Sequence, residues 1–293
     1  MNSILNDLKS QYKFGGITQR LIFWNIGCFL VSYVLFGLLR YFKIEIDFLE
    51  YVSLSSNPND FLWKPWSIIT YAFFHSDLFH IFFNMLLLNF SAQLFLTFFT
   101  QKQLLGLYLM AALFSGVLFV LSFYLMHIIV PIVGASAAIM SILVATTTYS
   151  PLMNIRLLLI GNVKLWHITL TILLIDLLQI TVANPGGHIA HLSGAFFGFV
   201  FIKLVEKGID LSKIISNLIA FFSTLFSKPE KTRLKTVHKN YKKPIAKPTS
   251  KIITKDKKQQ QIDEILDKIS RSGYDCLSKE EKDFLFQSGK ETK

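Results

Sequence analysis

The amino-acid sequence predicts an all-α polytopic membrane protein. Of its 293 residues, 52% are hydrophobic, and its mean hydropathy is +0.45. These values are too apolar for a soluble domain, and they come from several long uncharged runs separated by polar segments. The only two cysteines, Cys28 and Cys276, lie far apart in the sequence, so they predict neither a disulfide framework nor a cysteine metal site.

Six apolar runs are long enough, or nearly long enough, to cross a membrane. They cover residues 21–39, 79–99, 104–126, 135–149, 165–182 and 188–205. Lys and Arg residues precede the first run, separate the second from the third and the fourth from the fifth, and follow the sixth. Because positive residues are enriched on the cytoplasmic side, this distribution predicts that both termini are cytoplasmic.

The chain divides into five predicted segments. They are a cytosolic N-terminal segment (1–20), a six-helix membrane domain (21–205), an interfacial amphipathic helix (206–227), a basic flexible linker (228–258) and a small cytosolic helical hairpin (259–293). The linker holds twelve Lys and Arg residues against two acidic ones, so we expect it to be attracted to anionic lipids of the bilayer. Without interleaved aromatic residues, it does not predict nucleic-acid binding.

The C-terminal hairpin is predicted from helix stop and start signals. Ile262, Ile265 and Ile269 share one helical face, and Gly273 follows as a stop. Ser278 and Glu281 then have the spacing of a capping box at the start of a second helix.

Ser136 opens the fourth apolar run, directly after Gly134 and Ala135. A helix of about 15 residues at ~1.5 Å each is about 22 Å long. That is shorter than the hydrocarbon core of roughly 30 Å, so Ser136 is expected to lie below the outer surface. Small residues around a serine are also typical of close helix packing, so the motif predicts chemistry only if a base lies near it.

Polar residues of three runs meet at the expected depth of this serine. His191 lies one turn into the sixth run, and His80 and Asn84 share one face at the start of the second. Polar groups inside a membrane are expensive and commonly functional. We therefore expect acyl transfer, with Ser136 as nucleophile and His191 as general base, while His80, Asn84 and the Ser136 N–H stabilise the oxyanion.

Small residues on two runs can bring the serine and the histidine together. Gly194 and Gly198 are four residues apart in the sixth run, and Ala135 and Ala138 lie beside Ser136. Such residues allow the close helix contact that a Ser–His hydrogen bond of about 2.6 to 3.2 Å requires.

These residues resemble the rhomboid intramembrane serine proteases. The resemblance covers residues 60–205 and rests on three motifs, His75-x4-His80-x3-Asn84, Gly134-x-Ser136 and Ala190-His191-x2-Gly194. The sequence departs from the family pattern in three places. Ala137 stands where Gly often follows the serine, Leu96 stands where Glu is usual, and the loop after the first run offers Trp63-Lys64 and Trp66-Ser67 in place of the frequent Trp-Arg pair.

The resemblance implies a six-helix bundle in a bacterial plasma (inner) membrane, with no cofactor. It further implies a Ser136–His191 dyad that cuts single-pass or polytopic membrane protein substrates near the outer face. His80, Asn84 and Gly134 would then contribute to oxyanion and substrate binding. The C-terminal hairpin is similar to the cytosolic extension of some bacterial members.

Three other polar residues need an account. For Asp176, inside the fifth run, we expect a structural bond to Ser, Thr or another helix, and the orientation of an imidazole is the alternative. His188 is expected to be solvated at the surface, and His75 is expected to form hydrogen bonds at a loop end. No metal site is predicted, because no HExxH spacing is present.

Two other functions are alternatives to the peptidase. A rhomboid-like pseudoprotease would bind transmembrane helices without cleavage, but a pure binder does not need a base opposite a hydroxyl. A small-solute transporter is expected to show inverted repeats and broken helices near the midplane, and the sequence shows neither.

Overall fold

The structure is a computed structural model that describes residues 2–44, 46–157, 161–182, 184–226 and 250–290. It is mostly helical and divides into two compact units, Met1–Pro229 and Glu230–Lys293, which are described separately below.

The first unit begins with helix α1 (Asn2–Phe14) and a long apolar helix over Ile17–Tyr41. The long helix comprises α2 (Ile17–Leu30), a π-helical turn (Val31–Leu35) and α3 (Phe36–Tyr41). A segment of short elements follows it: α4 (Phe48–Val52), β1 (Leu54–Ser55), α5 (Pro58–Trp63), α6 (Ser67–Thr70) and a 3₁₀ turn (Tyr71–Phe73).

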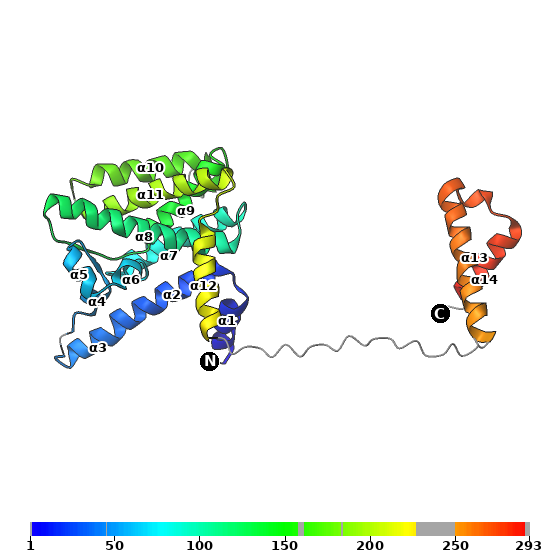
Figure 1. Cartoon of the computed structure of the whole chain (residues 1–293), viewed down its shortest axis with the longest axis horizontal. Coiled ribbons are helices and arrows are strands. Elements are labelled where there is room, and N and C mark those ends of the chain that lie inside the picture. Colours follow the sequence, from blue (N-terminus) through cyan, green and yellow to red (C-terminus); the bar gives the residue numbers. More distant parts are fainter. Residues whose placement is uncertain (1, 45, 158–160, 183, 227–249, 291–293) are drawn as a thin grey trace. The chain divides into compact units, whose positions relative to one another are not determined.

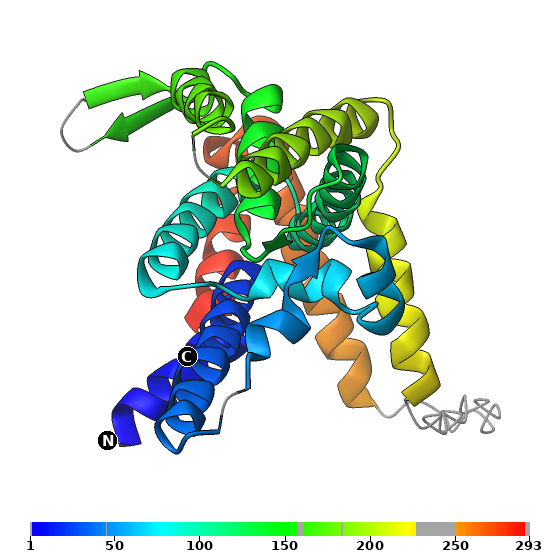
Figure 2. The ribbon, with the colours of Figure 1, turned by 90° about the vertical axis from the view of Figure 1, so that its left-hand side faces the viewer.

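Helix α9 (Ser136–Tyr149) lies at the centre of the remaining helices (Figures 1 and 2). Its residues 137–146 are all buried, and it packs against α7, α8, α10 and α11. These elements are α7 (Leu78–Leu96), α8 (Gln101–Met126), α10 (Leu165–Gln179) and α11 (Pro185–Glu206), followed by α12 (Ser212–Phe226). Between α9 and α10, the antiparallel strands β3 (Asn154–Leu157) and β4 (Gly161–Lys164) project from the helices (Figure 2).

Four helices of the described residues are long and apolar enough to cross a membrane. They are Ile17–Tyr41, Leu78–Leu96, Gln101–Met126 and Pro185–Glu206. The fourth and fifth predicted runs form shorter apolar helices, Ser136–Tyr149 and Leu165–Gln179. The fold therefore confirms a helical membrane protein, while the number of spans stays a prediction.

Helices α9 and α11 approach each other at two glycines. A side chain at Gly194 would collide with the carbonyl oxygen of Ala137, and one at Gly198 would collide with that of Ser141. Only hydrogen atoms fit at these two positions, so the backbones of the two helices lie in direct contact.

A short sheet that the sequence did not reveal fixes the segment before α9. Strand β1 pairs antiparallel with β2 (Pro131–Ile132), so that Leu54 lies opposite Ile132. The Ser56 N–H donates to the carbonyl of Val130, and its hydroxyl donates to the carbonyl of Ile128. Strand β1 and Ser56, which belong to the segment of short elements after α3, thus hold the chain that leads to Ser136.

The second unit contains helix α13 (Ser250–Ser272), a 3₁₀ turn (Tyr274–Cys276) and α14 (Lys279–Lys290). The predicted capping box is present, because the Ser278 N–H donates to Glu281 and the Glu281 N–H donates to the Ser278 hydroxyl. Lys268 of α13 pairs with Glu281 at 2.8 Å.

The predicted flexible linker 228–258 is partly wrong. Residues 250–258 already belong to α13, because Lys and Gln are good helix formers and no proline follows Pro248 in this stretch. The rest of the linker, up to residue 249, lies outside the described residues.

Gly198→Ala is expected to destabilise the membrane domain by about 1–3 kcal/mol, because the added methyl group forces α9 and α11 apart. The measurement is the unfolding midpoint in detergent. Gly27→Ala on α2 is the control, because a side chain there meets nothing within 4 Å. Equal midpoints for the two variants would contradict the close contact at Gly198.

Candidate active site

Ser136 and His191 are in hydrogen-bond contact. Ser136 is the first residue of α9, and His191 lies near the start of α11, one turn before Gly194. The Oγ atom of Ser136 is 2.6 Å from Nε2 of His191. A hydroxyl and an imidazole at this distance have the geometry of a nucleophile and a general base.

Gly134 provides open space beside the serine. Its φ of +135° lies in a region that side chains rarely adopt, and its N–H donates to the carbonyl of Tyr71 at 2.8 Å. A Cβ atom at this position would lie 2.8 Å from Nε2 of His80 and 3.4 Å from Oγ of Ser136. The space over Gly134 is therefore bordered by both the serine and His80.

His80 is held at the first turn of α7. Asp77 caps this helix, and its carboxylate accepts the His80 N–H at 2.8 Å. The Ser76 hydroxyl lies 2.8 Å from Asp77 Oδ2 and 3.0 Å from Nδ1 of His80. Hydrogen bonds from the His80 N–H and the Ser76 hydroxyl lower the pKa of Asp77, so this carboxylate stays ionised. Nδ1 of His80 thus has a partner, and Nε2 faces Gly134.

Asn84 is near this group and bonds to the backbone of His80. Its side-chain amide donates to the backbone carbonyl of His80 at 2.8 Å. Asn84 is buried on the predicted face of α7. In the part of the chain that the structure describes, no hydrogen bond joins it to Ser136.

Asp176 bonds to another helix, which was among the expected partners, and the groups that it contacts there are two imidazoles. It is buried within α10, and its Oδ1 lies 2.8 Å from Nδ1 of His191 and 2.6 Å from Nδ1 of His188. The prediction of a solvated His188 is therefore wrong, since only 13% of that side chain is exposed. The signal was present in the sequence, because an acidic residue in an apolar run needs a partner and His188 shares a helix face with His191.

These three side chains are also close enough to share one metal ion. Coordination through Nδ1 would require both Nδ1 atoms to be free of hydrogen. The short contacts to a single carboxylate oxygen are those of two N–H donors, so the cluster is satisfied as a hydrogen-bonded group.

His75 forms no hydrogen bond within the described residues, contrary to prediction. Its ring is 1% exposed and packs edge-on against His80, with 5.0 Å between the ring centroids. Burial, followed by the neighbouring His80, lowers the pKa of His75 to about 3. His75 is thus a neutral packing residue that supports the His80 ring.

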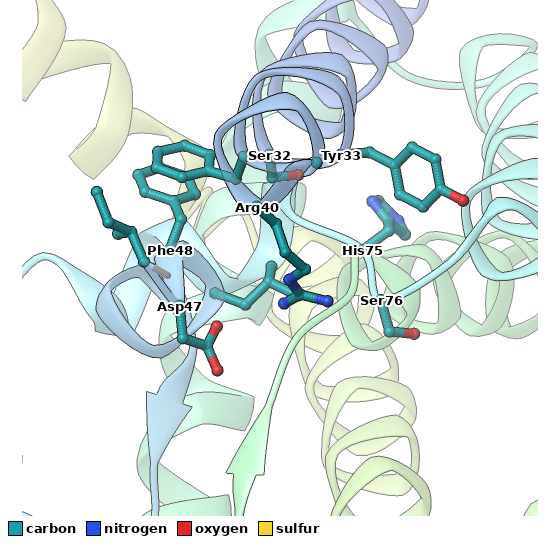
Figure 3. Close-up of a pocket in the computed structure, with 11 residues that line it drawn as sticks. Ser32, Tyr33, Arg40, Asp47, Phe48, His75 and Ser76 are labelled. Atoms are coloured by element: carbon teal, nitrogen blue, oxygen red, sulfur yellow. The ribbon is translucent and has the colours of Figure 1, made fainter. Parts of the chain in front are cut away.

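A cavity of about 410 Å³ lies next to this histidine pair. Figure 3 shows Arg40 between Asp47 and His75 in this view. The cavity is not lined by Ser136 or His191. Its lining residues are Ser32, Tyr33, Phe36, Gly37, Arg40, Ile46–Leu49, His75 and Ser76. The cavity therefore lies beside His75 and Ser76, which contact the His80 ring, and not beside Ser136.

The fold and these contacts define a helical membrane protein in which a serine contacts a histidine and the same histidine contacts an aspartate. Residues 62–207 match the family model described as the Rhomboid domain, and the chain belongs to the rhomboid family. Residues 253–290 match a family of unknown function, DUF6576. A search of curated proteins found no match.

Asp77→Ala is expected to cost about 0.5–2 kcal/mol of stability through loss of the α7 cap. Because the pKa of Asp77 is lower in the folded than in the unfolded protein, its ionised carboxylate stabilises the folded state at pH values above the unfolded pKa. This stabilisation is lost as the pH falls through the folded pKa. Unfolding midpoints at pH 7 and pH 3 measure both effects. A variant with the wild-type midpoint at pH 7 would contradict the role of the cap.

Proposed function

We propose that this protein is an intramembrane serine endopeptidase that cleaves transmembrane-helix substrates near the outer membrane face. The single observation that carries the proposal is the 2.6 Å contact between Ser136 Oγ and His191 Nε2. The rhomboid match over residues 62–207 supports it, because that family usually consists of serine intramembrane proteases.

In the proposed reaction, His191 removes the hydroxyl proton of Ser136 as its oxygen attacks the scissile carbonyl. His191 then passes this proton to the leaving amine, and the acyl group stays on Ser136. Water activated by the same imidazole hydrolyses this ester and restores the enzyme. No cofactor takes part in these steps.

The oxyanion is proposed to occupy the space over Gly134. Backbone N–H groups in the first turn of α9 have no partner within the helix, so they are available to an oxyanion there. His80 can donate through Nε2–H in the tautomer whose Nδ1 accepts the Ser76 hydroxyl hydrogen, and in that state Ser76 turns this hydrogen from Asp77 to His80. Asn84 contributes by holding the His80 carbonyl, and its second amide hydrogen is available to substrate.

The proposed topology has six membrane spans with both termini in the cytoplasm of a bacterium, and the protein lies in the plasma membrane. The short α9 then starts below the outer surface, where water can reach Ser136 through the polar ends of α7 and α11. Membrane proteins are the proposed substrates. The basic segment 228–249 is proposed to contact anionic lipids.

A pseudoprotease that binds transmembrane helices without cleavage is the second candidate. The rhomboid match is equally compatible with it. The contact between a serine and an imidazole favours the peptidase, because binding of a helix requires no such pair.

Ser136→Ala and His191→Ala are each expected to abolish cleavage and leave the fold intact, because each removes one partner of proton transfer. Cleavage of a transmembrane substrate in proteoliposomes measures this. Ser141→Ala is the matched control, since that hydroxyl bonds to the carbonyl of Ala138 in the same helix. Full activity of either site variant would refute the dyad.

A fluorophosphonate probe separates the two candidate functions. The wild-type protein in detergent is expected to be labelled at Ser136, and the His191→Ala variant is expected to remain unlabelled. An unlabelled wild-type protein beside a labelled active serine protease would favour the pseudoprotease.

Asn84→Ala is expected to lower kcat by at most about 10²- to 10³-fold, which is the usual loss for one oxyanion donor. Asn89→Ala on the same helix is the control, because Asn89 contacts Gln93 and lies two turns from His80. An unchanged rate for Asn84→Ala would remove this residue from the mechanism.

A further inference from the structure

Asp176 is a buried carboxylate in the apolar helix α10. Only 8% of its side chain is exposed, and one of its oxygens makes both of its short contacts. A carboxylate in such a place is costly unless it accepts hydrogen bonds from donors that carry or develop positive charge. Its two partners are imidazoles, which meet this requirement.

The contact assigns the tautomer of His191. An ionised carboxylate only accepts, so the hydrogen of the neutral imidazole must lie on Nδ1, 2.8 Å from Asp176 Oδ1. Nε2 then presents its lone pair to Ser136 Oγ at 2.6 Å. This tautomer can take the serine proton, whereas the other would place an N–H against the hydroxyl.

A purely structural tie between helices does not require a charge. Helices α9 and α10 are joined by the neutral hydroxyl pair Thr147 and Thr169, 2.6 Å apart. Asp176, by contrast, contacts the ring nitrogen opposite the one that faces the serine. The position of the carboxylate therefore suits the orientation of a base at His191, whereas helix packing alone would not require a charged side chain.

His188 holds the carboxylate in place. Its Nδ1 lies 2.6 Å from the same oxygen, one turn before His191 on α11. A second donor restricts the rotation of the Asp176 side chain and satisfies a further lone pair. The carboxylate is thus anchored independently of the imidazole that it orients.

We infer that Asp176 is a positioning residue that fixes the Nδ1–H tautomer of His191 and stabilises its imidazolium, and that His188 anchors this carboxylate. The inference rests on the proposed peptidase function and extends its dyad to a Ser136–His191–Asp176 triad. Asp176 touches neither substrate nor the reacting atoms.

The decisive variant is Asp176→Asn, which keeps the shape of the side chain but can donate to Nδ1 and stabilise the wrong tautomer. We expect kcat to fall by about 10²- to 10⁴-fold, the upper value being that of the same change in a soluble serine protease. KM is expected to change less than threefold, because substrate binding is untouched. Asp176→Glu is expected to recover part of kcat.

Thr169→Val is the matched control, since it removes the neutral tie of the same helix and is expected to keep kcat within about threefold. A wild-type kcat for Asp176→Asn, or an equal loss for Thr169→Val, would overturn the inference. A wild-type protein that cleaves no substrate would instead overturn the proposed function, and the triad with it.

Ring-¹⁵N histidine NMR of the wild-type protein in nanodiscs tests the tautomer without an activity measurement. The expected spectrum has His191 protonated at Nδ1 and unprotonated at Nε2, with its signal assigned by comparison with His191→Ala. A proton on Nε2 in the neutral wild-type ring would overturn the inference even if the enzyme is active.

Discussion

The contact between the backbones of α9 and α11 is the constraint on which the site depends. Two glycines of α11 lie against carbonyl groups of α9, where any side chain would collide. In a membrane, helices gain little from hydrophobic burial against each other, so close packing supplies much of their association. The same approach sets Ser136 and His191 at 2.6 Å, because each lies within one turn of the contact between Gly194 and Ala137. Two glycines outside the proposed dyad therefore determine the geometry of Ser136 and His191.

Hydrogen-bond contacts link four polar side chains of the site one after another. Ser136 contacts His191, His191 contacts Asp176, and Asp176 contacts His188. Each member would be costly in an apolar helix if its neighbour were removed. His75 is the exception, because its ring nitrogens have no hydrogen-bond partner among the described residues. Burial lowers its pKa, so the ring is neutral over the ordinary pH range. The charges of the site are thus confined to the carboxylates that have donors.

The sequence was sufficient to predict the features that leave a pattern in neighbouring residues. Apolar runs predicted the helices, and small residues beside Ser136 and His191 predicted the close helix contact. The sequence indicated that Asp176 needs a partner and offered an imidazole as one alternative. The choice between the alternatives depends on the rotation of α10 about its axis, and a helix that is apolar on every side does not encode that rotation. The pairing of β1 with β2 was missed for a different reason. Strands of two residues are too short to show an alternating pattern.

Gly134 connects these separate constraints. Strand β2 holds the chain just before this residue, and the carbonyl of Tyr71 accepts the N–H of Gly134 itself, so β1 and the turn before α7 both hold the start of α9. His80 approaches so closely that a methyl group at Gly134 would lie 2.8 Å from its ring nitrogen. The missing side chain therefore leaves space beside the Ser136 hydroxyl, the His80 ring nitrogen and the first N–H groups of a helix, which have no partner within that helix. In the proposed reaction, the His80 ring and these N–H groups would stabilise a negative charge that develops in this space, and a residue larger than glycine would fill it.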